Sequence, residues 1–297
     1  MRRITVILTI LLALSMVLFI GCGQEETSAP SESESAENSE SSEMSSGQSY
    51  EDGFYFAQED GFSERTGWKY IAILKVEDGK IVEANWEGAH KNAGNTKKVQ
   101  SESGEYGMVE KGGAQAPWFE QAEKVEARLL ETQDPTAISY DDGGYPDDIS
   151  GVSIHVNEFL TLAEEALANG PVGRGMYNDG AYHAEMPEFS HGYKYYVDLT
   201  VIGGYIVAAH WNAYPEEGEM HKYEASVEGE YGMVENGGAT APWFEQADKA
   251  EAYLLEIQDP TKIEYTSEEG HVDSISGVTI HVKEMFSLAE EALQDAK

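Results

Sequence analysis

A long internal repeat constrains the possible folds of this chain more than any other feature. The repeat is clearest in two segments that differ at only two positions, EYGMVEKGGAQAPWFEQA at 105–122 and EYGMVENGGATAPWFEQA at 230–247. Upstream, residues 67–86 match residues 192–211 at the same offset of 125 positions. Two copies of so long a unit exclude a solenoid, which stacks several short repeats. We therefore expect two homologous globular domains in tandem.

The boundary between the two domains is predicted from glycine and proline. The segment ANGPVGRG at 168–175 follows a helical pattern, and its glycines and proline are residues that break helices. We place the first domain at 50–168 and the second at 174–297. With 297 residues, the chain is long enough for each domain to bury its own core.

A β-hairpin is predicted near the start of each domain. In the first, two β-rich runs, YIAILKV and KIVEANW, flank the dipeptide Asp78-Gly79, which is favoured in tight hairpin turns. In the second, Gly203-Gly204 stands at the same place and provides the backbone freedom that such a turn needs.

Two helices are predicted after each hairpin. The segment 116–135 has Pro117 suited to a first helical turn, Asp134-Pro135 at its end, and one apolar face made of Phe119, Ala122, Val125 and Leu129. A closing helix carries an apolar stripe of Val156, Phe159, Leu160, Ala163 and Leu167. Because strands come first and helices flank them, we expect an α+β fold, with an antiparallel sheet and flanking helices in each domain.

The first 21 residues have the pattern of a secretory signal peptide. Arg2 and Arg3 precede an unbroken apolar run that ends at Gly21-Cys22. This end resembles a bacterial lipobox, which implies that Cys22 carries lipid and anchors the protein on the extracellular face of the cell membrane. Cys22 is the only cysteine, so it has no partner for an internal disulfide. The alternative is an uncleaved signal-anchor helix, since the run is near the short limit of spanning length.

Two further features of composition bear on partners. Residues 22–49 are rich in serine and glutamate and have few apolar side chains, so we expect a disordered linker that serves as a tether. The formal net charge is −36, and no basic stripe is present that could bind a phosphate backbone, so nucleic acid is not expected as a partner. An anionic membrane surface would repel such a chain, so membrane contact must come from the lipid anchor.

A repeated hydroxyl motif is the main candidate for a functional site. Each domain contains the motif just before its closing helix, as DDISGVS ending at Ser153 and as DSISGVT ending at Thr279. The hydroxyl could be a helix N-cap, which serine and threonine commonly provide. It could also bear a phosphate ester, because a helix N-terminus favours an anion and because Gly151 and Gly277 leave room beside it. The two roles are not exclusive.

The motif resembles that of the FMN-binding domain of sodium-pumping and related redox complexes, which occurs in tandem in PplA-like flavin lipoproteins of extracellular electron transfer. In that family a secreted flavin transferase esterifies the FMN phosphate to the hydroxyl of a Ser/Thr-Gly-Ala-Ser/Thr motif preceded by Asp. The matching residues are Asp147, Ser150, Gly151 and Ser153 in the first domain and Asp273, Ser276, Gly277 and Thr279 in the second. The resemblance implies covalent FMN on Thr279 and Ser153. This chain departs from the pattern in Val152 and Val278, which replace the usual alanine, and in His155 and His281, where a second Ser/Thr is common.

The resemblance also implies a function. We expect a membrane-anchored electron-transfer flavoprotein, rather than a substrate-specific enzyme, that carries electrons from a membrane quinone-linked oxidoreductase to external acceptors such as ferric iron. Trp118 and Trp243 are candidates to pack on the isoalloxazine, although buried aromatic rings are equally typical of cores. The alternative is a non-redox extracellular lipoprotein that binds a ligand or a protein partner through grooves at these tryptophans, with the hydroxyls acting only as caps.

Other chemistries find little support in the sequence. There is no CxxCH motif for haem and no set of cysteines for an iron–sulfur cluster. The eight histidines have no HExxH spacing, so no metal site is predicted. No GxSxG nucleophile motif is present, and no catalytic residue is assigned.

Overall fold

The computed structural model describes residues 49–297. The predicted signal peptide, Cys22 and all but the last residue of the predicted linker lie outside the described residues. Within 49–297, none of the helices has the length and apolar character that crossing a membrane requires.

Each repeat is built from one three-stranded antiparallel sheet and helices, so the predicted α+β class is confirmed. The first repeat contains β1 (Gly53–Gln58), β2 (Trp68–Glu77), β3 (Lys80–His90), α1 (Lys97–Ser103), α2 (Trp118–Thr132), η1 (Pro135–Ala137) and α3 (Asn157–Asn169). The second contains β4 (Gly180–Glu185), β5 (Tyr193–Ile202), β6 (Tyr205–Pro215), α4 (Lys222–Val227), α5 (Trp243–Ile257), η2 (Pro260–Lys262), α6 (Lys283–Ala292) and η3 (Gln294–Ala296). The predicted joint at 168–175 includes the last two residues of α3 and ends before β4.

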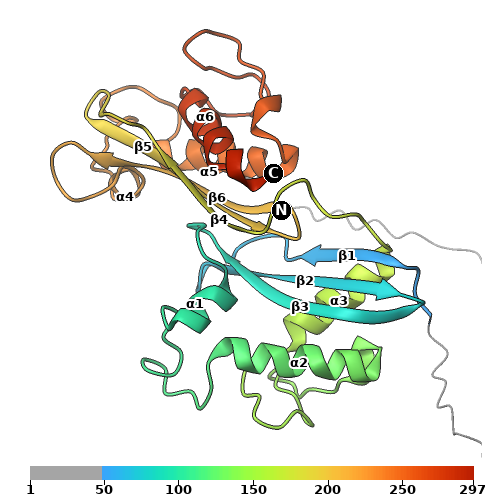
Figure 1. Cartoon of the computed structure of the whole chain (residues 1–297). Helices are drawn as coiled ribbons and strands as arrows, with labels where there is room; N and C mark the ends of the chain where they lie inside the picture. The colour runs from blue at the N-terminus through green and yellow to red at the C-terminus, as the bar shows by residue number, and fades with distance from the viewer. Residues whose placement is uncertain (1–48) are drawn as a thin grey trace, which may run out of the picture. The chain divides into compact units, whose positions relative to one another are not determined.

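The sheets have the simple order β1-β2-β3 and β4-β5-β6. The central hairpins turn where the sequence predicts, since Asp78 and Gly79 have φ values of 52° and 73°, and Gly203 and Gly204 have 64° and 82°. Positive φ at both central residues matches the right-handed twist of the flanking strands. Helices α2 and α3 lie on one side of the first sheet (Figure 1).

Each repeat has a core of its own between its sheet and its two long helices. In the first, the ring of Trp86 is fully buried and stacks on Phe159 at 5.3 Å between ring centroids. Trp211 takes the matching place in the second core. A third, smaller cluster draws buried residues from both repeats, namely Ile71, Ala89, Ala93, Ile202, Val207 and Ala208.

Two details of the predicted helix faces are wrong. Trp118, not Phe119, packs in the first core; Phe119 is only half-buried. The reason is helical spacing, because position 118 shares a face with positions 122, 125 and 129, whereas position 119 lies about 100° further round. In the closing helix Leu167 is only partly buried, and the buried side chains are Phe159, Leu160, Leu162, Ala163 and Ala166.

Candidate functional site

The two motif hydroxyls are held by buried glutamines. In the first repeat the backbone N–H of Ser153 donates to Gln121 Oε1 at 2.7 Å, and the Ser153 hydroxyl donates to the same oxygen at 3.2 Å. Thr279 makes the same two bonds to Gln246, at 2.7 and 3.2 Å. Both glutamines are almost fully buried. Since a buried amide is costly to leave unpaired, each glutamine fixes the loop that carries the motif.

These hydroxyls are not helix caps, so the capping interpretation is wrong. Helix α3 begins at Asn157 with Val156 as its N-cap, and helix α6 begins at Lys283 with Val282 as its N-cap. Ser153 lies before that boundary, and its hydroxyl points to a glutamine of α2 instead. The residues that follow each hydroxyl form an extra stretch of loop before the helix, which the sequence pattern did not reveal.

A lysine lies beside each motif. Gly151 has φ of 76°, and a Cβ there would lie only 2.7 Å from Lys124 Nζ, which donates to the carbonyl oxygen of Gly151 at 3.3 Å. Likewise, a Cβ at Gly277 would lie only 2.8 Å from Lys249 Nζ. Glycine therefore suits the positive φ at both positions, whereas each ammonium stands at the end of a flexible side chain and could move aside for a Cβ. Lys124 and Lys249 were not predicted from the sequence.

Each hydroxyl also lines a cavity. The cavity of the first repeat has a volume of about 690 Å³, and that of the second about 490 Å³. The two are lined by matching residues, among them Tyr106, Trp118 and Ser153 in the first and Tyr231, Trp243 and Thr279 in the second. Ser153 and Thr279 are themselves exposed, so the hydroxyls are accessible at the rim.

Trp118 and Trp243 pack in the two cores and also line the two cavities. They are 2% and 3% exposed and belong to the two cores. Trp118 packs against Trp86 at 5.1 Å, and Trp243 against Trp211 at 4.9 Å. Each also lines its cavity, so one edge of a core ring forms part of the cavity wall.

The other motif residues are not brought to the cavities. Asp147, Ser150, Asp273 and Ser276 are exposed, and the cavity walls do not include them. The acidic group that pairs with a cation in this region is the neighbouring Asp148, whose carboxylate accepts from Arg128 at 2.8 Å.

A buried lysine in a cage of aromatic rings is the strongest feature that sequence reasoning missed. Lys97 is 2% exposed, and its ammonium lies 4.6–5.2 Å from the centroids of four rings: Trp68, Tyr70, Tyr106 and Trp118. Lys222 is 3% exposed and has the corresponding cage of Tyr193, Tyr195, Tyr231 and Trp243 at 4.4–5.1 Å. All four rings of the first cage and three of the four rings of the second also line the cavities.

Burial in each cage shifts the pKa of the lysine it encloses. Burial lowers the pKa of Lys97 to about 7 and that of Lys222 to about 8. The faces of the rings attract an ammonium and so oppose this shift. Lys97 donates to the Tyr70 hydroxyl at 2.8 Å, and burial raises the pKa of that phenol well above its usual value.

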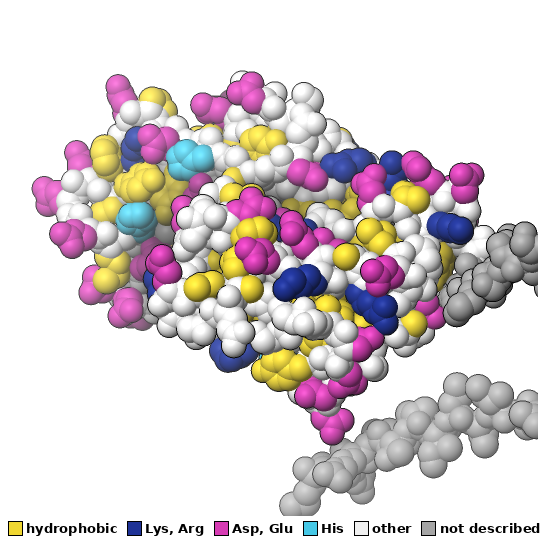
Figure 2. Space-filling model, turned by 60° about the horizontal axis from the view of Figure 1, so that its bottom comes forward, with side chains coloured by type: hydrophobic (Ala, Val, Ile, Leu, Met, Phe, Trp, Pro, Cys, Tyr) yellow, Lys and Arg dark blue, Asp and Glu magenta, His cyan; other side chains and the backbone are white. Residues whose placement is uncertain are grey.

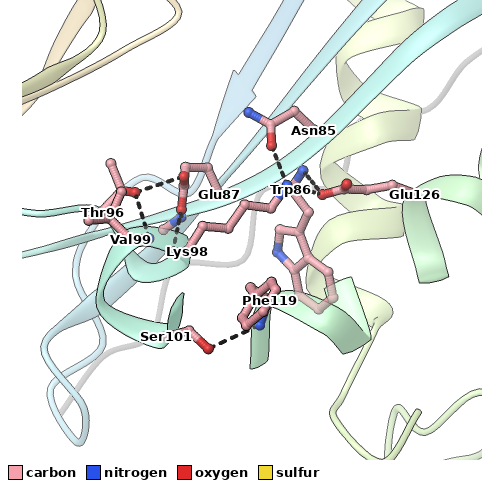
Figure 3. Close-up of polar contacts among 10 residues, drawn as sticks. Asn85, Trp86, Glu87, Thr96, Lys98, Val99, Ser101, Phe119 and Glu126 are labelled. Carbon is pink, nitrogen blue, oxygen red and sulfur yellow. Dashed lines mark hydrogen bonds and ion pairs between the residues drawn. The ribbon is translucent and has the colours of Figure 1, made fainter. Parts of the chain in front are cut away.

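A polar network behind the first cage fixes α1 against β3 and α2. Figure 3 shows Lys98 reaching Glu126, at 2.7 Å, and Thr96 donating to Glu87 at 2.8 Å. The Ser101 hydroxyl accepts from the N–H of Phe119 at 3.1 Å. Because Lys97 lies between Thr96 and Lys98, these bonds orient it toward the rings.

One face of the molecule carries many acidic side chains. Figure 2 shows Asp and Glu side chains spread over the visible face, with Lys and Arg in small separate groups and patches of hydrophobic side chains between them.

No protein-family model and no curated protein matches the chain. A solution structure of a Clostridium thermocellum protein is 50% identical over 40% of this chain and 90% of its own, with a TM-score of 0.33. A crystal structure of a Clostridium perfringens protein is 27% identical over 41% of this chain and 88% of its own, also with a TM-score of 0.33.

Proposed function

We propose that this protein is a membrane-anchored extracellular flavoprotein that carries covalent FMN on Thr279 and Ser153. Its function is to shuttle electrons from a membrane quinone-linked oxidoreductase to external acceptors such as ferric iron. The observation that carries the proposal is the matched pair of sites. In each repeat an accessible hydroxyl stands at the rim of an aromatic-lined cavity, with a lysine beside its motif.

The residues fit a flavin phosphoester in three respects. Lys124 and Lys249 would provide a cation for the phosphate, to which ammonium groups bind well. Cavities of about 690 and 490 Å³ are within the usual range for cofactor sites. Glu158 lines the first cavity, and its Oε2 is buried without a hydrogen-bond partner among residues 49–297. A ribityl chain offers hydroxyl donors for such an oxygen.

When bound, FMN supplies the redox chemistry. The chain's own contribution is to hold and shield it. Trp118 and Trp243 offer ring edges for an aromatic cofactor. Lys97 holds a titratable ammonium behind the rings of the first cavity, and Lys222 holds one in the wall of the second. A covalent link suits an extracellular location, because a released cofactor would be lost by dilution. Lipid on Cys22 would retain the protein at the membrane, and a secreted flavin transferase would attach the FMN.

The experiment is co-expression of the chain with a flavin transferase in a secretory compartment, followed by denaturation and intact-mass measurement. We expect an added mass of one or two FMN-phosphoryl units and in-gel fluorescence. Ser153→Ala and Thr279→Ala should each remove one unit, and Thr279→Ser should keep it. The matched controls are Ser150→Ala and Ser276→Ala, which change exposed hydroxyls of the same motif away from the cavity and should keep both units.

Two outcomes would contradict the proposal. A double variant, Ser153→Ala with Thr279→Ala, that retains acid-stable flavin would show that other residues carry it. A colourless wild-type protein of unmodified mass would favour the alternative, a non-redox lipoprotein that uses the same cavities for another ligand.

A further inference from the structure

The second repeat brings together three side chains that can bind a metal ion. Glu269, His271 and His281 each offer one ligand atom, and these atoms all lie within 4.8 Å of one another. The two imidazole rings are 4.3 Å apart between centroids, and His271 Nε2 lies 4.0 Å from Glu269 Oε2. All three side chains are exposed or half-buried, so an ion could reach them.

The first repeat has the same backbone arrangement with only one of these three ligands, because His155 matches His281. The N–H of Val282 donates to Gly270 at 3.0 Å, just as Val156 donates to Gly144 at 2.8 Å. In the first repeat, however, the partner of His155 is Tyr145, at 4.5 Å between ring centroids. Ring packing, together with a 3.9 Å contact between His155 Nδ1 and Glu158 Oε1, accounts for the first pair. In the second repeat the tyrosine is replaced by His271 and the loop gains the carboxylate of Glu269, which ring packing does not require.

We propose that Glu269, His271 and His281 bind a divalent transition-metal ion of the zinc class. Two imidazoles and a carboxylate are typical ligands of such ions. Around tetrahedral zinc, ligand atoms at about 2.0–2.1 Å from the metal lie about 3.3 Å from one another. Small rotations of these side chains, of which Glu269 has 73% of its side chain exposed, close the gap from the observed separations.

The site has a defined place relative to the cavity. His281 is both a proposed ligand and part of the wall of the second cavity, two residues beyond Thr279. Three protein ligands leave one coordination position for water or for an anionic group. The bound ion would add positive charge at the rim of the second cavity and not of the first. This proposal needs no flavin and does not rest on the proposed function.

The test is a titration of the untagged, metal-free and flavin-free full chain with Zn²⁺ by calorimetry, and with Co²⁺ by visible absorption. We expect one equivalent to bind, with Co²⁺ bands typical of nitrogen and oxygen ligands. His281→Ala and His271→Tyr should each weaken binding at least about tenfold. Loss of a residue that only hydrogen-bonds to a metal ligand already lowers affinity by about that much, and loss of a ligand should cost no less. The substitution His271→Tyr restores the aromatic pair of the first repeat, so the fold is retained.

The first repeat provides the matched controls. His155→Ala and Tyr145→Phe should leave Zn²⁺ affinity and stoichiometry unchanged. Conversely, Tyr145→His combined with Gly143→Glu should raise the stoichiometry to two equivalents, because His155 already stands at the third position. The proposal is overturned if the wild type binds no more Zn²⁺ than the variant His271→Tyr, or if His155→Ala weakens binding as much as His281→Ala.

Discussion

The ammonium of Lys98 lies 2.7 Å from the carboxylate of Glu126, whereas Tyr223 takes the place of that lysine in the second repeat. Glu126 and its counterpart Glu251 each accept from the backbone N–H of a buried tryptophan at 2.7 Å. Burial raises the pKa of both carboxyls, and it raises that of Glu251 well above the usual value. The same buried position therefore holds an ion pair in one repeat and an acid without a matching lysine in the other.

This difference predicts that replacing the glutamate by glutamine changes the free energy of unfolding differently in the two repeats. Glu126→Gln removes a partly buried charged partner of Lys98 and should lower the free energy of unfolding by about 2 kcal/mol at neutral pH. Glu251→Gln should leave it unchanged or raise it, because the amide oxygen can still accept from Trp211 and no carboxylate has to ionise. Urea unfolding of both variants measures the difference. A larger loss from Glu251→Gln than from Glu126→Gln would contradict this account.

The pH dependence follows from the raised pKa of Glu251. Above the usual pKa of a glutamate, the folded state binds more protons than the unfolded state, so stability should fall as pH rises through the folded pKa. The variant Glu251→Gln should lack this fall. Denaturant midpoints of the wild type and the variant, measured from pH 5 upward, provide the test.

The caged lysines predict a pH dependence at higher pH. Burial lowers the pKa of Lys97 to about 7 from an ordinary value of 10.5, so between these values the unfolded state binds more protons. Stability from this group should therefore rise with pH across that window and be lowest below about 7. Lys97→Met should flatten the profile, and the exposed Lys80→Met should not. Equal profiles for wild type and Lys97→Met would contradict the shifted pKa.

The buried glutamines should matter more to stability than the hydroxyls they hold. Gln246→Ala removes the acceptor for Thr279 and Ile280 and should cost about 1–3 kcal/mol of unfolding free energy. Thr279→Ala loses only the 3.2 Å bond of the hydroxyl and should cost less than about 1 kcal/mol. Thermal melts of the two variants make the comparison, and the reverse order would show that the hydroxyl is the structural anchor.

Each repeat should fold alone, because each has a complete sheet, two long helices and its own core. Expressed separately, 50–168 and 174–297 should melt cooperatively, but below the melting temperature of the tandem. The reason is the third cluster, which loses its partner residues when the repeats are separated. Absence of a cooperative transition in both fragments would mean that the repeats depend on a shared core.

The anchor prediction concerns residues outside the described part of the chain. Cys22→Ala should leave the protein uncleaved or released, because the thiol is the acceptor for lipid in the lipobox interpretation. Detergent-phase partitioning and intact mass of the membrane fraction measure this. A Cys22→Ala protein that still partitions as a mature lipoprotein would rule out the interpretation.

Local patterns predicted much of the fold. The turns at Asp78-Gly79 and Gly203-Gly204 follow from local backbone preference, and the helices follow from apolar spacing. Gln121 stands three residues after Trp118 and four before Val125, so the sequence places a polar residue on the apolar face of α2. The structure shows this residue buried beside Ala122. Such a position usually indicates a hydrogen-bond partner in the core. Here the partner was the loop of the hydroxyl motif.

The cages and the histidine cluster could not be predicted in this way. The rings around Lys97 come from β2, from the loop after α1 and from the first turn of α2, so their convergence depends on tertiary packing. In sequence, Lys97 resembles any solvated lysine at a helix start. Likewise, His271 and His281 lie ten residues apart, a spacing that no helical metal motif uses.

The hydrogen bond between Gln246 and the N–H of Thr279 determines whether the loop can fold before a group is attached to Thr279. That bond uses the backbone and leaves the loop in place whether or not the side-chain oxygen is free. The loop can therefore take its final shape before anything is attached to Thr279, and can keep it afterwards. An enzyme that modifies this oxygen would recognise a finished surface rather than an unfolded peptide, and the same holds for Ser153.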